Sequence, residues 1–303
     1  MKERKKEEVM KTVEPKFILC PTDFSELATL ALRYGMRFAD CFGARLMVLY
    51  ADPFTPPPYF TSGQVENLSN EIERSKGTAR EYLIRYVKEH VGDLPETAEM
   101  AVVQNEPVPA IMDVAEQRDS GLIVMGTHGR SGFRRFRLGS VAEKILHETD
   151  RPVLTVREKR RGETASKVSI QHVLCPINYT EVAFKALEHA VAVSKCFGAE
   201  LLALHVIESH AAEVTDQDEH ARLCSWIPDE TRARCSLKEI IRRGDAAEQI
   251  IEMASSGGCD LIVLGAQHKR FSETTVIGTT TLRVTRHAPC PVLTVVHRRG
   301  SLQ

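Results

Sequence analysis

The chain has 303 residues, which is enough for two domains of about 150 residues each. Its 43% apolar and 27% charged residues are typical of a globular protein, and 40 basic residues against 41 acidic ones give no reason to expect binding to nucleic acid or to an anionic membrane. The densely charged start, MKERKKEEVMK, does not resemble a secretory signal, and no apolar run is longer than a strand, so we expect a cytoplasmic protein without membrane contact.

Five short apolar runs in the first half predict β-strands at 17–20, 45–50, 98–103, 122–125 and 153–156. They contain β-branched residues and lack a clean alternation of apolar and polar positions, which indicates strands buried on both faces. Apolar residues at three- and four-residue steps predict an amphipathic helix over 24–42, and shorter helices are predicted over 110–117 and 140–147. Strands that alternate with helices predict an α/β fold with a doubly wound parallel sheet of five strands.

The second half of the chain repeats the first. Residues 17–44 match 172–199 at an offset of 155, and both segments end in Cys-Phe-Gly-Ala. Residues 121–130 match 260–269 at an offset of 139, so the second copy is 16 residues shorter between these blocks. We therefore predict two tandem domains, 15–157 and 168–297, each with a five-stranded parallel sheet and joined by a charged linker.

A glycine-rich loop follows the fourth predicted strand and runs from Gly126 to Ser140. Phosphate binding needs several main-chain N–H groups without Cβ obstruction, and it gains from a helix N-terminus. Gly139 and Ser140 directly precede the helical stretch VAEKILHE, and Ser140 and Glu143 have capping-box spacing. The pattern predicts an anion site, in which Ser140 either contacts phosphate or only caps the helix. In the alternative interpretation the glycines only form turns.

At this point the sequence resembles the universal stress protein family in its tandem two-domain form. The resemblance rests on Pro-Thr-Asp-Phe-Ser after the first strand and on G-x2-G-x9-G-[S/T], here Gly126, Gly129, Gly139 and Ser140. It implies an adenine nucleotide alpha-hydrolase-like, Rossmann-like fold that holds ATP, with Mg²⁺ or Mn²⁺ on the phosphates. The adenine would lie near Pro21, Asp23 and the end of the second strand. The implied nucleotide-binding residues are Pro21, Thr22, Asp23, Ala51, Gly126, Thr127, His128, Gly129, Arg130, Ser131, Gly132, Gly139, Ser140 and Val141.

The second copy departs from this pattern at two points. Asn178 stands where the first copy has Asp23, and His268 stands where it has Gly129. A Cβ and an imidazole in place of a glycine should obstruct close approach of phosphate to the backbone. Because Gly278 and Thr279 still offer a helix start, weak or altered binding stays open, but we expect this copy to be chiefly structural.

Several residues keep two interpretations. Asp23 either contacts the nucleotide or only caps the following helix, since Asp23 and Glu26 also have capping-box spacing. The basic side chains of the loop either meet phosphates or a partner or face water; these are Arg130, Arg134, Arg135 and Arg137. His128 has no ligand or base partner at a recognisable spacing, so it is interpreted as loop filler, and eight cysteines without a CxxC pair predict no metal site.

The leading functional hypothesis is a binding module in which ATP in the first domain tunes a conformation or an interaction with a protein partner. The second is an interaction protein of the same fold without an operative nucleotide. The third, an enzyme that uses ATP, lacks support, because no Walker loop and no nucleophile paired with a base occur; at most slow hydrolysis is expected. In the family the terminal strands of such sheets pair across domains, which here implies pairing within the chain or a homodimer.

Overall fold

The computed structural model describes residues 13–53, 62–95, 97–129, 138–157, 168–208, 215–271 and 274–297, with side chains left out at 62–75, 267–271, 274–276 and 297. The chain forms two compact units, one made of 15–168 with 270–277 and the other of 1–14, 169–269 and 278–303. Each is described by itself below, as the first and the second domain.

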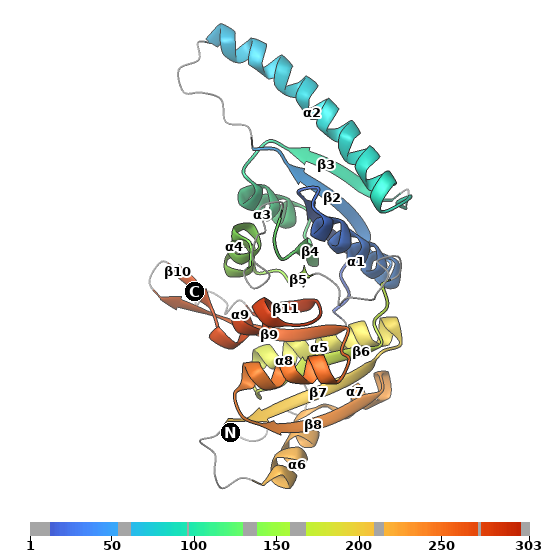
Figure 1. The fold of residues 1–303 in the computed structure, drawn as a ribbon, viewed down its shortest axis with the longest axis vertical. Helices are drawn as coiled ribbons and strands as arrows, with labels where there is room; N and C mark the ends of the chain where they lie inside the picture. The colour runs from blue at the N-terminus through green and yellow to red at the C-terminus, as the bar shows by residue number, and fades with distance from the viewer. Residues whose placement is uncertain are drawn as a thin grey trace. The chain divides into compact units, whose positions relative to one another are not determined.

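The first domain alternates strands and helices as the sequence predicts (Figure 1). In chain order its elements are β1 (Phe17–Thr22), α1 (Glu26–Phe42), β2 (Arg45–Ala51), α2 (Ser62–His90), β3 (Glu99–Val103), α3 (Pro107–Gln117), β4 (Leu122–Gly126), α4 (Ser140–Glu148) and β5 (Val153–Val156). The strands are parallel and lie in the order β3-β2-β1-β4-β5. The chain therefore reverses direction across the sheet between β1 and β4, where doubly wound folds place their ligands.

The central strands of the first domain are buried on both faces and form its core. Ile18, Val48 and Ile123 are fully buried, as continuous apolar runs in a parallel sheet require. Helix α1 covers one face with an apolar stripe that includes Leu30 and Phe38.

The second domain repeats this order. Its elements are β6 (His172–Pro176), α5 (Glu181–Phe197), β7 (Glu200–Ile207), α6 (Asp216–Trp226), α7 (Asp229–Arg234), β8 (Leu237–Arg243), α8 (Ala246–Ser256), β9 (Leu261–Phe271), α9 (Thr279–His287) and β11 (Val292–His297). The last two residues of β9 and the short strand β10 (Thr274–Ile277) fall in the segment 270–277, which is grouped with the first unit. The parallel order β11-β9-β6-β7-β8 matches that of the first domain, which confirms the predicted fold of two similar five-stranded sheets.

Two differences separate the domains. The 29-residue α2 of the first domain corresponds to the short helices α6 and α7, which explains most of the missing length. In addition, β9 does not end at Gly265 as β4 ends at Gly126, but continues to Phe271 and pairs with β10. The stretch 265–278, expected as a loop from the sequence, is thus largely a strand extension. Among the described residues, no helix is long and apolar enough to cross a membrane.

Candidate functional site

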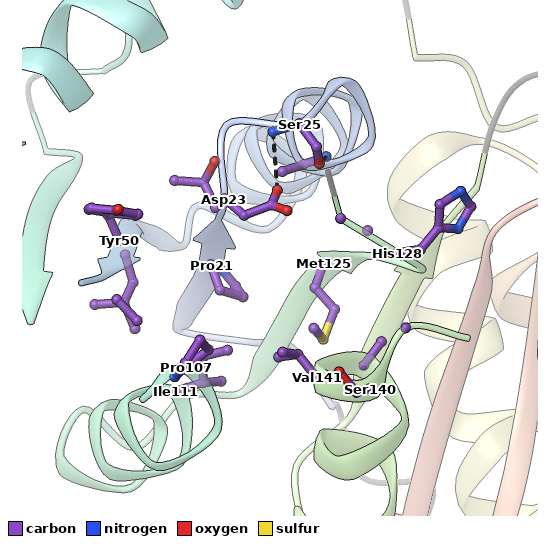
Figure 2. Close-up of a pocket in the computed structure, with 18 residues that line it drawn as sticks. Pro21, Asp23, Ser25, Tyr50, Pro107, Ile111, Met125, His128, Ser140 and Val141 are labelled. Atoms are coloured by element: carbon purple, nitrogen blue, oxygen red, sulfur yellow. Dashed lines mark hydrogen bonds between the residues drawn. The ribbon is translucent and has the colours of Figure 1, made fainter. Parts of the chain in front are cut away.

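A cavity of about 380 Å³ opens at the carboxyl ends of β1, β2 and β4 (Figure 2). Ten of the residues predicted from the sequence line it: Pro21, Thr22, Asp23, Ala51, Gly126, His128, Gly129, Gly139, Ser140 and Val141. Thr127 lies next to the lining and is itself buried. The remaining predicted residues, Arg130, Ser131 and Gly132, lie outside the described part of the chain. The other arginines of the loop, Arg134, Arg135 and Arg137, also lie outside it.

The sequence interpretation missed most of the apolar wall of this cavity. The additional lining residues are Ser25, Ala28, Leu49, Tyr50, Pro107, Ile111, Met125 and Ala142. Pro107 and Ile111, from the first turns of α3, lie across the cavity from Asp23 (Figure 2). A signal for them existed, because the helix after the third strand must also start at this edge of the sheet, and residues four apart share a helix face.

Asp23 is held at the rim of the cavity by the turn between β1 and α1. The Ser25 N–H donates to Asp23 Oδ1 at 3.1 Å, and the Ala28 N–H donates to Ser25 Oγ at 3.2 Å. Ser25 is therefore the N-cap of α1. The capping box expected between Asp23 and Glu26 is wrong, because the N-cap of α1 is Ser25, two residues after Asp23. The other carboxylate oxygen of Asp23 lies beside Gly129 of the glycine loop.

The loop glycines serve different purposes. A Cβ on Gly126 would lie 3.1 Å from Leu27 Cβ and 3.3 Å from the Ala28 nitrogen, so Gly126 permits the close packing of α1 on the end of β4. Gly129 instead faces the site, because a Cβ there would lie only 2.1 Å from Asp23 Oδ2. The space that Gly129 leaves open is thus shared between the acidic side chain and the loop backbone.

The loop returns to the cavity at the start of α4. The Gly139 N–H donates to the Thr127 carbonyl at 2.7 Å, and a Cβ on Gly139 would lie 3.1 Å from His128 Cα. Gly139 is the N-cap, and no described side chain caps the helix. The capping box expected between Ser140 and Glu143 is therefore wrong, because Ser140 is already the first helical residue.

This helix start is suited to an anion. The Glu143 N–H donates to the Gly139 carbonyl at 2.9 Å and closes the first turn of α4, so the N–H groups of the three residues before it have no acceptor within the helix. Those residues, Ser140, Val141 and Ala142, all line the cavity. Their amides and the helix dipole place partial positive charge at this end of the cavity.

His128 contributes an imidazole to the rim of the site. Its Nδ1 lies 3.1 Å from Thr127 Oγ1, and its ring points away from Met125 and Val141 (Figure 2). Within the described residues, no group of three or more histidine, cysteine, aspartate or glutamate side chains could hold a metal ion.

The corresponding corner of the second domain is filled with side chains from α6. His205, which matches Tyr50, donates from Nδ1 to the Ile177 carbonyl at 2.8 Å, and its Nε2 lies 3.4 Å from Glu219 Oε1. Arg222 Nη1 donates to the same oxygen at 3.0 Å and lies over the Tyr179 ring. Burial, and then the nearby charge of Glu219, raises the pKa of the Tyr179 phenol.

The profile of the universal stress protein family matches residues 15–157 and again 169–296. The chain belongs to the universal stress protein family. A universal stress protein of Methanocaldococcus jannaschii is 27% identical over 146 residues, which covers 48% of this chain and 84% of that protein. One from Mycolicibacterium smegmatis is 22% identical over 298 residues, covering 92% of this chain and 96% of the relative, so the tandem arrangement occurs elsewhere in the family.

Solved structures of universal stress proteins have the same fold. The crystal structure of a universal stress protein from Archaeoglobus fulgidus matches with a TM-score of 0.68 at 24% identity, covering 94% of this chain and 99% of that one. At this level of identity the likeness concerns the fold, and the chemistry of the site has to be argued from the residues described above.

Proposed function

We propose that the first domain binds ATP, one molecule per chain, and that the protein acts as a nucleotide-dependent regulatory or interaction module in a stress response. The observation that carries this proposal is the cavity, which joins an apolar slot to an uncapped helix start within one space. An adenine nucleotide has a similar division between a flat aromatic base and an anionic chain.

The apolar end suits a purine. Leu49, Pro107, Ile111 and Met125 supply an aliphatic surface, and Ala51 closes the end of β2 with a small side chain. The faces of a flat aromatic ring gain from such surroundings through the apolar area removed from water, about 25 cal/mol per Å².

The anionic end suits a chain of phosphates. The amides of Ser140 and Val141 lie at the start of α4, and Gly129 and Gly139 keep the loop backbone accessible. Asp23 is the acidic side chain among the described lining residues, and a single carboxylate does not build a metal site by itself. We therefore expect Mg²⁺ or Mn²⁺ to be held mainly by the phosphates, with Asp23 close to them.

The second domain supports a stoichiometry of one. The backbone beyond Gly265 is paired in the sheet, with Ala266 opposite Val296 and Gln267 opposite His297, so we expect these two residues not to offer their amides to a ligand, although α9 also starts without a side-chain cap. Asn178 and His268 change the two residues that meet at the first site.

We favour a binding role over catalysis, since the imidazole of His128 lies at the rim with its ring directed away from Met125 and Val141 (Figure 2), and its Nδ1 is engaged with Thr127. We expect at most slow hydrolysis of bound ATP.

The test is the nucleotide content of the purified chain, measured by chromatography after denaturation, followed by calorimetric titration of the emptied protein with MgATP. One adenine nucleotide per chain is expected. A stoichiometry of two would overturn the asymmetry between the domains. No binding at millimolar MgATP would overturn the proposal and leave the interaction protein without nucleotide as the remaining hypothesis. Fast turnover that is lost on changing one side chain would instead indicate an enzyme.

A further inference from the structure

The turn that presents Asp23 has an unfavourable backbone at its centre. Phe24 has φ of 64°, in the left-handed region that residues with a Cβ rarely adopt. Its N–H donates to Thr22 Oγ1 at 3.1 Å, which is a contact within the turn itself. Such a conformation persists where its surroundings hold it in place.

Tyr86 of α2 stabilises the turn from outside it. Its hydroxyl donates to the Phe24 carbonyl at 3.0 Å and lies 2.5 Å from Thr29 Oγ1. A carbonyl can only accept and a phenol has one proton, so in the bond to Phe24 the proton comes from Tyr86, and the proton between the two hydroxyls then comes from Thr29. One hydroxyl on α2 thus connects to both the turn and the first turn of α1.

Tyr86 is itself fixed in place. It is 9% exposed, and its ring packs edge-on against Phe24 with centroids 5.1 Å apart and stacks on His90 at 4.2 Å. Its neighbours Leu83 and Val87 are buried in the core, which anchors this half of α2 along β3 (Figure 1).

We propose that Tyr86 is a positioning residue of the nucleotide site, which fixes the left-handed turn at Phe24 and thereby the carboxylate of Asp23. This inference rests on the proposed function and extends it to α2. Asp23 Oδ2 lies beside Gly129, so a shift of the turn changes both the acidic group and the space along the phosphate loop. Because coupling between sites is reciprocal, bound nucleotide in turn stabilises the C-terminal half of α2.

The experiment compares Tyr86→Phe with Tyr82→Phe in the otherwise unchanged chain. Tyr82 is the matched control, because its ring also packs edge-on against Phe24, at 4.9 Å, while 41% of the residue is exposed. Hydrogen exchange without nucleotide should become about tenfold faster at residues 22–29 in Tyr86→Phe and stay unchanged in β1 and in Tyr82→Phe. The dissociation constant for MgATP should rise about fivefold in Tyr86→Phe alone, as expected for the loss of one hydrogen bond.

In the wild type, MgATP should slow exchange over 76–90, and this protection should be lost in Tyr86→Phe. Wild-type exchange at 22–29 together with wild-type affinity in Tyr86→Phe would overturn the inference while the proposed function stands. Faster exchange in β1 as well would show a general loss of stability and would also overturn it. Absence of MgATP binding by the wild type would overturn the proposed function. The two failures can be told apart, because this one is measured on the wild type and the other on Tyr86→Phe.

Discussion

The turns after β1 and after β6 have a similar backbone conformation but carry different side chains. Phe24 and Tyr179 occupy the same place and both have left-handed φ values, 64° and 60°. Ser25 and Thr180 each cap the next helix through a side-chain oxygen. Since the second domain keeps this geometry although its glycine loop is replaced, the turn belongs to the folding of each domain. What a domain binds depends on the residues set on that turn and on the segment that follows the fourth strand.

The largest expected effect is on nucleotide affinity when the first domain receives the second domain's residue. Gly129→His places a Cβ 2.1 Å from the present position of Asp23 Oδ2 and an imidazole on the loop. MgATP affinity should fall at least a thousandfold, equivalent to about 4 kcal/mol. Gly77→His is the control, because a Cβ at Gly77 meets nothing within 4 Å. Calorimetry on both variants decides, and binding retained by Gly129→His would refute the assignment of the loop.

The next effect concerns the stability of the second domain. Glu219 is 6% exposed and contacts both the exposed Arg222 and the His205 imidazole, so Glu219→Ala leaves the His205 side chain, which is 13% exposed, without its carboxylate. We expect the free energy of unfolding of this domain to fall by about 3 kcal/mol, and urea denaturation measures this loss. Affinity for MgATP should not change. A parallel loss of affinity would show that the two domains are not independent in the way the comparison assumes.

A smaller effect separates packing glycines from binding glycines. A Cβ on Gly265 would lie 2.7 Å from the Val182 carbonyl oxygen, whereas the corresponding distance for Gly126 is 3.1 Å to Leu27 Cβ. Gly265→Ala should therefore cost about 2 kcal/mol of stability and Gly126→Ala about 1 kcal/mol, both measured as shifts of the urea midpoint. If Gly126→Ala kept full stability but lost MgATP binding, Gly126 would be a phosphate residue after all.

The smallest effect tests three helix starts, those of α1, α5 and α4. Ser25→Ala removes the N-cap of α1 and should cost about 1 kcal/mol, and Thr180→Ala should behave alike in the second domain. Ser140→Ala should change the stability by less than about 0.5 kcal/mol, because Gly139 is the cap of α4. Thermal unfolding of the three variants distinguishes these values; a loss of equal size in Ser140→Ala would restore the capping role for that residue.

Much of this arrangement follows from the sequence, because its signals are local or repeated. Buried apolar runs located all five strands of the first domain, and the repeated Cys-Phe-Gly-Ala marks two helix ends at which Gly43 and Gly198 adopt the left-handed conformation. The loop glycines and Asp23 were found because their spacing is distinctive. Both capping boxes were misplaced, since a spacing of three fits several registers and hydrogen bonds choose among them.

Other features depend on contacts that no short pattern encodes. The apolar wall of Pro107 and Ile111 arises from how α3 crosses the sheet, and the hold of Tyr86 on the turn joins residues more than 60 positions apart. The extension of β9 was hidden as well, because the glycines at 265 and 278 suggested a loop, whereas pairing with β11 and β10 decides the backbone.

The extension of β9 also limits how a bivalent variant could be engineered. Reverting His268 to glycine and Asn178 to aspartate would restore two side-chain identities, yet the amides that a ligand needs would still lie in a strand that pairs through Gln267. A designer would have to transplant the whole connection from the end of β4 to the start of α4. The two domains thus differ in the path of the chain after the fourth strand, which point substitutions do not change.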